Sequence, residues 1–343
     1  MKTVVADADN QNVSKLLEPY IQSGALNFLF GSGASFPAIE TAGDIEAQID
    51  AYLLLGLEED ADKKSFAFLE AINAINREFL TGAPGDDAVA VRERYRRFVG
   101  ILDSILLARK SQLLARQAVV FTTNYDLFFE DAVAAVPGVV LNDGFDRSAP
   151  LAAPVFAPER YFDRIYRSSS PLGRSTEVPT INLVKLHGSL SWQRQADEVV
   201  ARAGPVAAPV AGAIDVAAPR SAYLTDHVLI LPSVRKFHST LMERIYYDLL
   251  RLFARCLEVD NAVLLAFGFS FVDKHILDLT RRSLRNPTAQ LIIVAFDAAA
   301  AESFAAMFAR HRNVTIVAPA AGAVIDFTRL NDILEAIVPE ANK

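Results

Sequence analysis

The chain has 343 residues, of which 52% are hydrophobic and 22% charged, as in a compact globular protein and not a disordered one. Its formal net charge of -7 argues against a general nucleic-acid binder, which needs clustered Lys and Arg to neutralise phosphates. The single cysteine, Cys256, excludes an internal disulfide and any zinc site built from several thiolates.

The five histidines are scattered without the spacing of metal ligands. No uncharged apolar run approaches the roughly 20 residues that a membrane-spanning helix needs. The N-terminal residues also lack the apolar core of a signal peptide. We therefore expect a soluble cytoplasmic protein with no metal centre and no membrane association.

The first core strand is predicted at residues 25–30 (ALNFLF), after a polar N-terminal segment and a short amphipathic stretch at 16–21. The glycine-rich turn that follows it consists of Gly31, Ser32, Gly33, Ala34 and Ser35. Glycines let a backbone turn tightly and bring its N–H groups close to an anion, so this turn is a candidate phosphate cradle. A plain strand-to-helix turn explains the same residues. No GK[ST] follows, which argues against a P-loop NTPase.

Residues 44–117 carry no strand signal but show helical spacing in three segments, at 44–55, 62–80 and 86–116. We expect them to form a helical subdomain inserted between the first two core strands. The basic run RERYRR at 92–97 either attracts an acidic partner or forms a solvated helix face.

A second strand is predicted at residues 118–121, where the apolar run AVVF stops abruptly at the polar sequence TTNYD. The carboxyl ends of parallel strands open into the crevice where ligands bind, which makes Asn124 and Asp126 candidates for chemistry. The alternative is that both residues cap the helix expected at 127–136.

A short strand is expected at residues 139–141, followed by a long surface excursion at 143–180, which is rich in proline. The next strand, at 182–186, runs directly into His187 and Gly188. An isolated histidine at a strand end is often structural, but the adjacent glycine would admit a ligand.

Residues 196–222 are rich in Ala, Val, Pro and Gly and predict a loosely packed flap. Another strand is expected at 229–231, with Pro232 and Ser233 at its end, and then a helix at 239–257.

The strongest parallel-strand signal is AVLLAF at residues 262–267, and it ends in the sequence GFSFVD. The remaining elements alternate: helix 273–285, strand 290–295, helix 299–310, strand 314–317 and helix 328–337. Such alternation predicts an α/β protein with a Rossmann-like, doubly wound parallel sheet.

Four strand ends thus carry compact polar or glycine motifs, and in this order they resemble the sirtuin (SIR2) family over residues 25–300. Gly31, Gly33 and Ser35 are similar to the GAGxS loop, which in that family holds the NAD diphosphate. Asn124 and Asp126 are similar to the Asn and Asp of the TQNID motif around the nicotinamide ribose and carboxamide.

The later motifs continue the resemblance. His187 with Gly188 is similar to the catalytic His-Gly pair, and Gly268 with Ser270 to the GTS motif near the adenosine ribose. The segment GFSFVDKHI, which includes Asp273, looks like the G-[YF]-S-x-x-D segment of SIR2-like domains in prokaryotic anti-phage systems.

The chain departs from sirtuin deacylases in two places. The four-cysteine zinc module is missing, and PAIETAGDI stands where the GIPDFR segment would follow the first glycine loop. Because of these departures, the resemblance does not extend to the acyl-lysine tunnel of the deacylases. The resemblance then implies the anti-phage SIR2-like domains, which hydrolyse NAD instead of deacylating protein.

On this resemblance we expect one SIR2-like domain over residues 1–343, with an NAD-binding core at 25–43 and 118–340 and the helical insertion at 44–117. Asn124 and His187 are the expected catalytic residues, because His187 can accept a proton and Asn124 can orient water and ribose hydroxyls. The expected NAD-binding residues are Gly31, Ser32, Gly33, Ala34, Ser35, Thr123, Asp126, Gly188, Gly268, Ser270 and Asp273.

The expected function is hydrolysis of NAD to nicotinamide and ADP-ribose in anti-phage defence, without zinc. A non-catalytic NAD- or ADP-ribose-binding subunit and a zinc-free deacylase are the alternatives. The resemblance also implies a homo-oligomer larger than a dimer, controlled by a partner such as a HerA-type ATPase or another phage-sensing factor. We expect no binding of nucleic acid by this chain alone.

Overall fold

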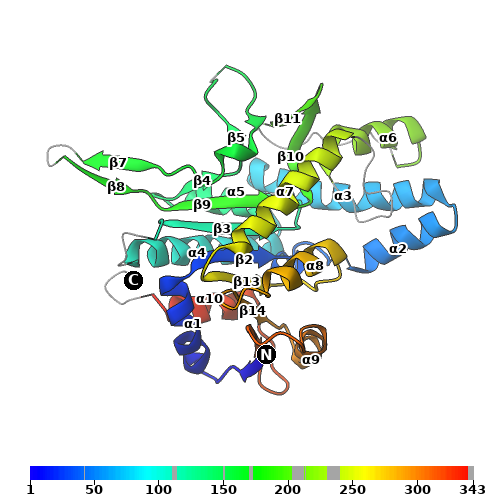
Figure 1. The fold of residues 1–343 in the computed structure, drawn as a ribbon. Helices are drawn as coiled ribbons and strands as arrows, with labels where there is room; N and C mark the ends of the chain where they lie inside the picture. Colours follow the sequence, from blue (N-terminus) through cyan, green and yellow to red (C-terminus); the bar gives the residue numbers. More distant parts are fainter. Residues whose placement is uncertain are drawn as a thin grey trace.

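A computed structural model describes residues 1–41, 43–109, 114–149, 151–169, 173–202, 212, 214–229 and 240–338. Its centre is an 8-stranded sheet in which every neighbouring pair is parallel (Figure 1). The strands lie in the order β1 (Lys2–Val5), β15 (Val314–Ala318), β14 (Gln290–Val294), β13 (Ala262–Phe267), β2 (Ala25–Phe30), β3 (Gln117–Thr122), β9 (Thr180–Lys185) and β4 (Val140–Asn142).

The winding of this sheet is the doubly wound α/β arrangement that the sequence predicts. The chain enters the centre at β2 and moves outward through β3 to the edge strand β4, before β9 fills the place between β3 and β4. It then returns to the centre at β13 and moves outward on the other side through β14 and β15. The direction therefore reverses between β2 and β13, and in such sheets the crevice beyond the strand ends at this switch point is the usual ligand site.

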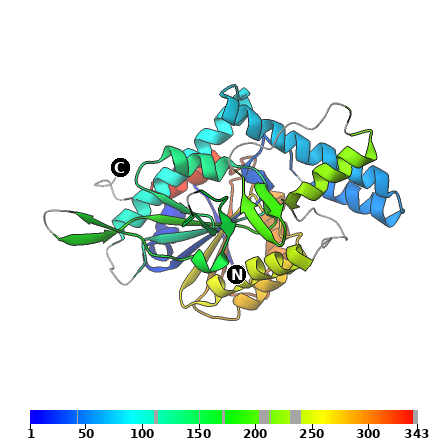
Figure 2. The same cartoon turned by 90° about the horizontal axis from the view of Figure 1, so that it is seen from above.

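Helices cover both faces of the sheet (Figure 2). The helices and short 3₁₀ turns are α1 (Gln11–Ser23), η1 (Ser32–Ala34), α2 (Gly43–Leu54), α3 (Glu58–Thr81), α4 (Asp86–Ala108), α5 (Phe128–Ala135), η2 (Pro158–Arg160), α6 (Ala217–Asp226), α7 (Thr240–Glu258), α8 (Lys274–Ser283), α9 (Ala298–Met307) and α10 (Phe327–Glu335). Helices α1, α4, α5 and α10 pack in the core on one face, and α7, α8 and α9 on the other. None of the helices within the described ranges is long and apolar enough to cross a membrane.

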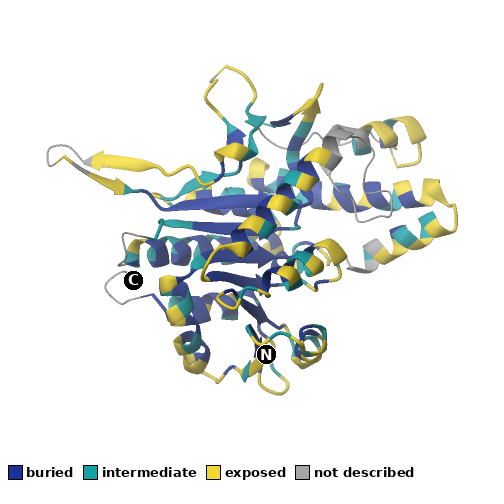
Figure 3. Ribbon diagram, viewed as in Figure 1, coloured by how far each residue is buried: buried dark blue, intermediate teal, exposed yellow. Residues whose placement is uncertain are grey.

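Alternation along the strands explains the two cores. In β2, Phe28 and Phe30 belong to the first core and Leu29 to the second, because successive strand side chains point to opposite faces. Both faces are covered, so the central strands need apolar residues at nearly every position, and Figure 3 shows them as buried throughout.

Two antiparallel sheets correct the expectations for the middle of the chain. One contains β12 (His227–Leu229), β10 (Gly188–Gln195), β11 (Glu198–Ala201), β6 (Val155–Phe156) and β5 (Phe145–Asp146), in that order. The other is the hairpin β7 (Tyr166–Ser169) and β8 (Arg174–Glu177), which projects from the body in Figures 1 and 2.

The excursion expected at 143–180 does lie largely at the surface, but its described residues include the strands β5 to β8. The loosely packed flap expected at 196–222 is wrong for its described residues, which include β11 and the start of α6. Trp192 packs against Phe145 and Phe156 at ring-centroid distances of 5.6 and 5.2 Å, which gives the five-stranded sheet its own apolar centre. The strand expected at 229–231 is described only to Leu229, where it pairs antiparallel with β10 and not with the main sheet. Pro232 and Ser233 lie outside the described residues.

The N-terminal segment also differs from its prediction as a polar lead-in. Residues Lys2–Val5 form β1, an edge strand that pairs with β15 from the far end of the chain. An edge strand of four residues with little burial carries almost no periodic signal. By contrast, the three helical segments predicted within 44–117 are confirmed as α2, α3 and α4, although α4 ends at Ala108.

Glycines bring the ends of β2 and β13 into direct backbone contact. Gly33 N donates to Gly268 O at 3.0 Å, and Gly31 N donates to Phe267 O at 3.1 Å. A Cβ on Gly268 would lie 2.6 Å from Ala34 N, and Gly268 also has a φ of +63°. A Cβ on Gly33 would lie 2.9 Å from the Cα of Gly268. Side chains are excluded here because two backbones already occupy the space.

This contact predicts an unequal response to alanine at two positive-φ glycines. Gly322 has a φ of +75°, but a Cβ there would meet nothing within 4 Å, so Gly322→Ala should cost only the roughly 1–2 kcal/mol of left-handed strain. Gly268→Ala adds overlap with Ala34, which should cost about 1–3 kcal/mol more. Urea unfolding of both variants measures the difference, and equal losses would show that the backbone contact is not tight.

Candidate active site at the strand ends

The four motif-bearing strands end at the same level of the sheet. Phe267 of β13 is in register with Phe30 of β2, Phe30 with Thr122 of β3, and Thr122 with Lys185 of β9. The polar motifs begin directly after this row. Asn124 and His187 each lie two residues beyond the paired Thr122 and Lys185, so β3 and β9 deliver them to the same edge.

Asn124 ties the end of β3 to the glycine loop after β2. Its Nδ2 donates to Gly31 O at 3.0 Å and to Ser35 Oγ at 3.1 Å, and its backbone N–H donates to Thr122 Oγ1 at 3.0 Å. Both amide hydrogens are thereby used within the protein. A ligand at Asn124 can therefore bind only to the carbonyl oxygen, which is an acceptor for water or for ribose hydroxyls.

The hydroxyl of Ser35 is the centre of this polar cluster. It donates to Asp126 Oδ2 at 2.7 Å and lies 2.9 Å from the hydroxyl of Tyr95, a fully buried residue of α4. Since the single Ser35 proton goes to Asp126, Tyr95 donates to Ser35, as Asn124 does. Burial, with the charge of Asp126 nearby, holds the pKa of Tyr95 well above its usual range, so its hydroxyl stays a donor.

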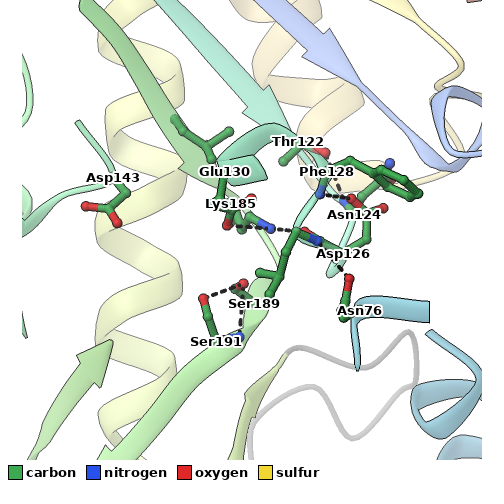
Figure 4. Close-up of polar contacts among 12 residues, drawn as sticks. Asn76, Thr122, Asn124, Asp126, Phe128, Glu130, Asp143, Lys185, Ser189 and Ser191 are labelled. Atoms are coloured by element: carbon green, nitrogen blue, oxygen red, sulfur yellow. Dashed lines mark hydrogen bonds and ion pairs between the residues drawn. The ribbon is translucent and has the colours of Figure 1, made fainter. Parts of the chain in front are cut away.

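Next to Asp126 lies a buried cation that contacts one carboxyl group and one backbone oxygen (Figure 4). Lys185, which is 3% exposed, donates to the backbone oxygen of Asp126 and lies 3.0 Å from Glu130 Oε1. The side chain of Glu130 is 24% exposed, yet its Oε2 atom is buried without a hydrogen-bond partner. Burial raises the pKa of both Asp126 and Glu130, and the charge of Lys185 opposes that rise.

His187 faces the start of helix α8. Its Nε2 lies 3.1 Å from Asp273 Oδ2, while Asp273 Oδ1 accepts from the backbone N–H groups of His275 at 2.8 Å and Ile276 at 3.2 Å. Asp273 is thus both the N-cap of α8 and the partner of the histidine. This arrangement joins the third strand-end motif to the fourth.

Two aromatic rings flank the imidazole of His187. Tyr125 lies at a centroid distance of 6.5 Å and Tyr246 of α7 at 6.4 Å. Burial, with Asp273 close by, raises the pKa of Tyr246, so this phenol remains protonated. The imidazole therefore lies between two aromatic rings with one carboxylate at hydrogen-bond distance.

The other predicted site residues fall on the same edge, in different settings. Ser32, Gly33 and Ala34 form the single 3₁₀ turn η1, so no long helix begins at this loop. Gly188 has a φ of +85°, which lets the chain turn from His187 into β10. Thr123 N continues the ladder by donating to Phe30 O at 3.2 Å, and Ser270 is exposed at the rim.

Sequence reasoning missed the supporting residues Tyr95, Lys185, Glu130 and Tyr246. The acids Asp126 and Glu130 were an available signal, because they lie close together where a buried strand passes into a helix. Lys185 stood at the end of a predicted buried strand, where a cation needs a partner. Nothing local marked Tyr95 or Tyr246, whose roles depend on how α4 and α7 pack.

The described residues contain no group of three or more His, Cys, Asp or Glu side chains that could hold a metal ion. Cys256, the one thiol of the chain, is buried in the core, and burial raises its pKa to about 12.

The buried Lys185 leads to a pH-dependent prediction. A raised carboxyl pKa means that the folded state binds the proton more tightly, so Glu130 and Asp126 cost stability as the pH rises above their unfolded pKa values of about 4. Lys185 offsets that cost. Lys185→Met should lower the free energy of unfolding by roughly 3–5 kcal/mol at pH 7.5 and by less at pH 5.

Denaturant unfolding at the two pH values measures this effect. The double variant Lys185→Met with Glu130→Gln should recover part of the loss at pH 7.5, because one uncompensated carboxylate is removed. A loss independent of pH would mean that packing, and not charge, explains the role of Lys185.

One known protein family matches the part of the chain that builds most of this edge. Residues 118–317, more than half of the 343-residue chain, match the SIR2-like domain family. The matched region contains the motifs after β3, β9 and β13, and the contact of Gly33 with Gly268 places the fourth motif beside them. No curated protein sequence gives a match. The SIR2-like family uses NAD as a substrate, and this chain belongs to it.

Proposed function

We propose that the chain is an NAD hydrolase that cleaves NAD to nicotinamide and ADP-ribose. The observation that carries the proposal is the pairing of buried His187 with Asp273, at the same carboxyl edge of a SIR2-like sheet as Asn124. A module that only bound NAD would need the glycine loops. It would not need a histidine held by a carboxylate between two aromatic rings.

The proposed reaction is the attack of water on C1′ of the nicotinamide ribose. The bond from C1′ to the pyridinium nitrogen breaks, and its electron pair leaves with neutral nicotinamide. One water proton passes to His187 as the C1′–O bond forms. The carbonyl oxygen of Asn124 accepts from the water or a ribose hydroxyl and fixes its position, since its NH₂ group is held by Gly31 and Ser35.

The direct test is incubation of the purified chain with NAD and separation of the products by chromatography. Nicotinamide and ADP-ribose should appear without any acylated peptide. Appearance of O-acetyl-ADP-ribose only when an acetylated peptide is added would replace the hydrolase with a deacylase. Tight binding of NAD with no turnover would favour the non-catalytic binding subunit.

Two site variants separate chemistry from structure. His187→Ala should lower kcat by about 10²- to 10⁴-fold with little change in melting temperature. Asn124→Ala should also lower kcat, and it should cost about 1–3 kcal/mol of stability because Gly31 O and Ser35 lose a buried donor. His311→Ala, in a histidine outside this edge, is the matched control and should retain wild-type turnover. Unchanged kcat in His187→Ala would contradict the assignment of His187 as the general base.

The proposal extends to anti-phage defence by NAD depletion, with control through assembly or a partner such as a HerA-type ATPase. Its support is the resemblance to defence-associated SIR2-like domains and the need to restrain an enzyme that consumes NAD. The surfaces available for assembly include the connection between α2 and α3, where Leu54 and Leu55 are 81% and 73% exposed and Leu57 is 43% exposed. This end lies well beyond the main sheet in Figures 1 and 2.

Light scattering tests the assembly. The wild-type chain should be a homo-oligomer larger than a dimer, and replacement of Leu54, Leu55 and Leu57 by Ser should shift it to smaller species because the exposed apolar area is lost. Val259→Ser, at a residue that is 46% exposed, serves as the control. A stable wild-type monomer with full constitutive activity would contradict control by assembly.

A further inference from the structure

The cap of helix α8 fixes the position of a carboxylate oxygen. Asp273 Oδ1 accepts from two successive backbone N–H groups, those of His275 and Ile276, at 2.8 and 3.2 Å. These bonds hold the carboxyl group in one orientation, with Oδ2 turned away from the helix. Oδ2 then lies 3.1 Å from Nε2 of His187, a residue 86 positions earlier in the chain.

The short contact determines which imidazole nitrogen carries the proton. A carboxylate oxygen is an acceptor only, so Nε2 must donate. The opposite neutral tautomer would place the lone pair of Nε2 against the lone pairs of Oδ2. In the neutral ring Nδ1 is then the acceptor, the nitrogen that can take a proton from a ligand or water.

From this geometry we infer that Asp273 is a positioning residue, which holds His187 in the Nε2–H tautomer so that Nδ1 serves as the proton acceptor. The inference rests on the proposed hydrolysis for its catalytic meaning, but the tautomer itself is a property of the free protein. It gives Asp273 a role through His187, in addition to the expected contact with NAD. The helix start, and not a flexible loop, sets the direction of the histidine.

Replacing Asp273 by asparagine separates its two roles, which are to cap helix α8 and to accept a hydrogen bond from His187. Asn caps helices as well as Asp does, and its Oδ1 must face His275 N and Ile276 N because its NH₂ group cannot accept. The NH₂ group then replaces Oδ2 opposite His187. There it can donate to an unprotonated Nε2, which favours the inverted Nδ1–H tautomer. Asp273→Asn should therefore retain helix α8 and reverse the imidazole.

Helices α9 and α10 provide matched controls. Asp297 caps α9 by accepting from Ala300 N at 2.8 Å, and Asp326 caps α10 by accepting from Arg329 N at 2.9 Å. Asp297→Asn and Asp326→Asn change the same cap chemistry away from His187. Any loss that these variants share with Asp273→Asn comes from the caps alone.

The experiment uses the full chain labelled with ¹⁵N-histidine, with the His187 signals assigned by their absence in His187→Ala. Long-range ¹H–¹⁵N spectra at alkaline pH should show the Nε2–H tautomer in the wild type and in both controls, and the Nδ1–H tautomer in Asp273→Asn. The Nδ1–H form in the wild type, or an unchanged tautomer in Asp273→Asn, would overturn the assignment.

Kinetics on NAD give the second readout. Asp273→Asn should lower kcat by at least about 100-fold with KM changed less than about threefold, because the ring presents the wrong nitrogen to the reaction. The controls should stay within about twofold of the wild type. A rise in KM at unchanged kcat would overturn positioning in favour of NAD binding. If the wild type hydrolyses no NAD, the proposed function fails, and the spectra alone decide the tautomer.

Discussion

The backbone contact between the loops after β2 and β13 is the constraint on which this edge of the molecule depends. Gly33 N reaches Gly268 O at 3.0 Å only because neither residue carries a side chain. The contact closes the two halves of the winding at the point where the sheet reverses direction. It places a tight glycine turn where ligands bind in related α/β sheets, while the N–H groups of Gly31, Gly33, Ala34 and Ser35 donate to backbone oxygens within the protein.

Polar side chains near this contact form hydrogen bonds with one another at the carboxyl ends of the strands. Ser35 donates to Asp126 and accepts from Asn124 and Tyr95, while Lys185 lies between Asp126 and Glu130. Burial makes such groups costly unless each finds a partner, so the network holds the strand ends in one arrangement. The acceptor oxygen of Asn124 is thus presented by a rigid framework.

The histidine is supported by a different part of the chain. His187 follows β9, and the next residue, Gly188, begins strand β10 of the antiparallel sheet. The carboxylate partner of His187 is Asp273, the N-cap residue of α8. Tyr246 comes from α7 on the same face of the sheet. Three segments distant in sequence therefore define the direction of one imidazole.

The sequence by itself determined the parallel sheet and the residues at its edge, because apolar runs such as 262–267, followed directly by polar or glycine motifs, are local signals. Sheet membership was decided by tertiary structure: β1 is recognisable only through its pairing with β15, and β12 only through β10. The same holds for the partners of His187 and Lys185, since the hydrogen bond between Asp273 and His187 spans 86 positions and that between Lys185 and Asp126 spans 59, and neither leaves a periodic pattern. The periodicity of apolar residues indicates which face of a helix or strand is buried. Which side chain lies against that face depends on how the helices and strands pack together.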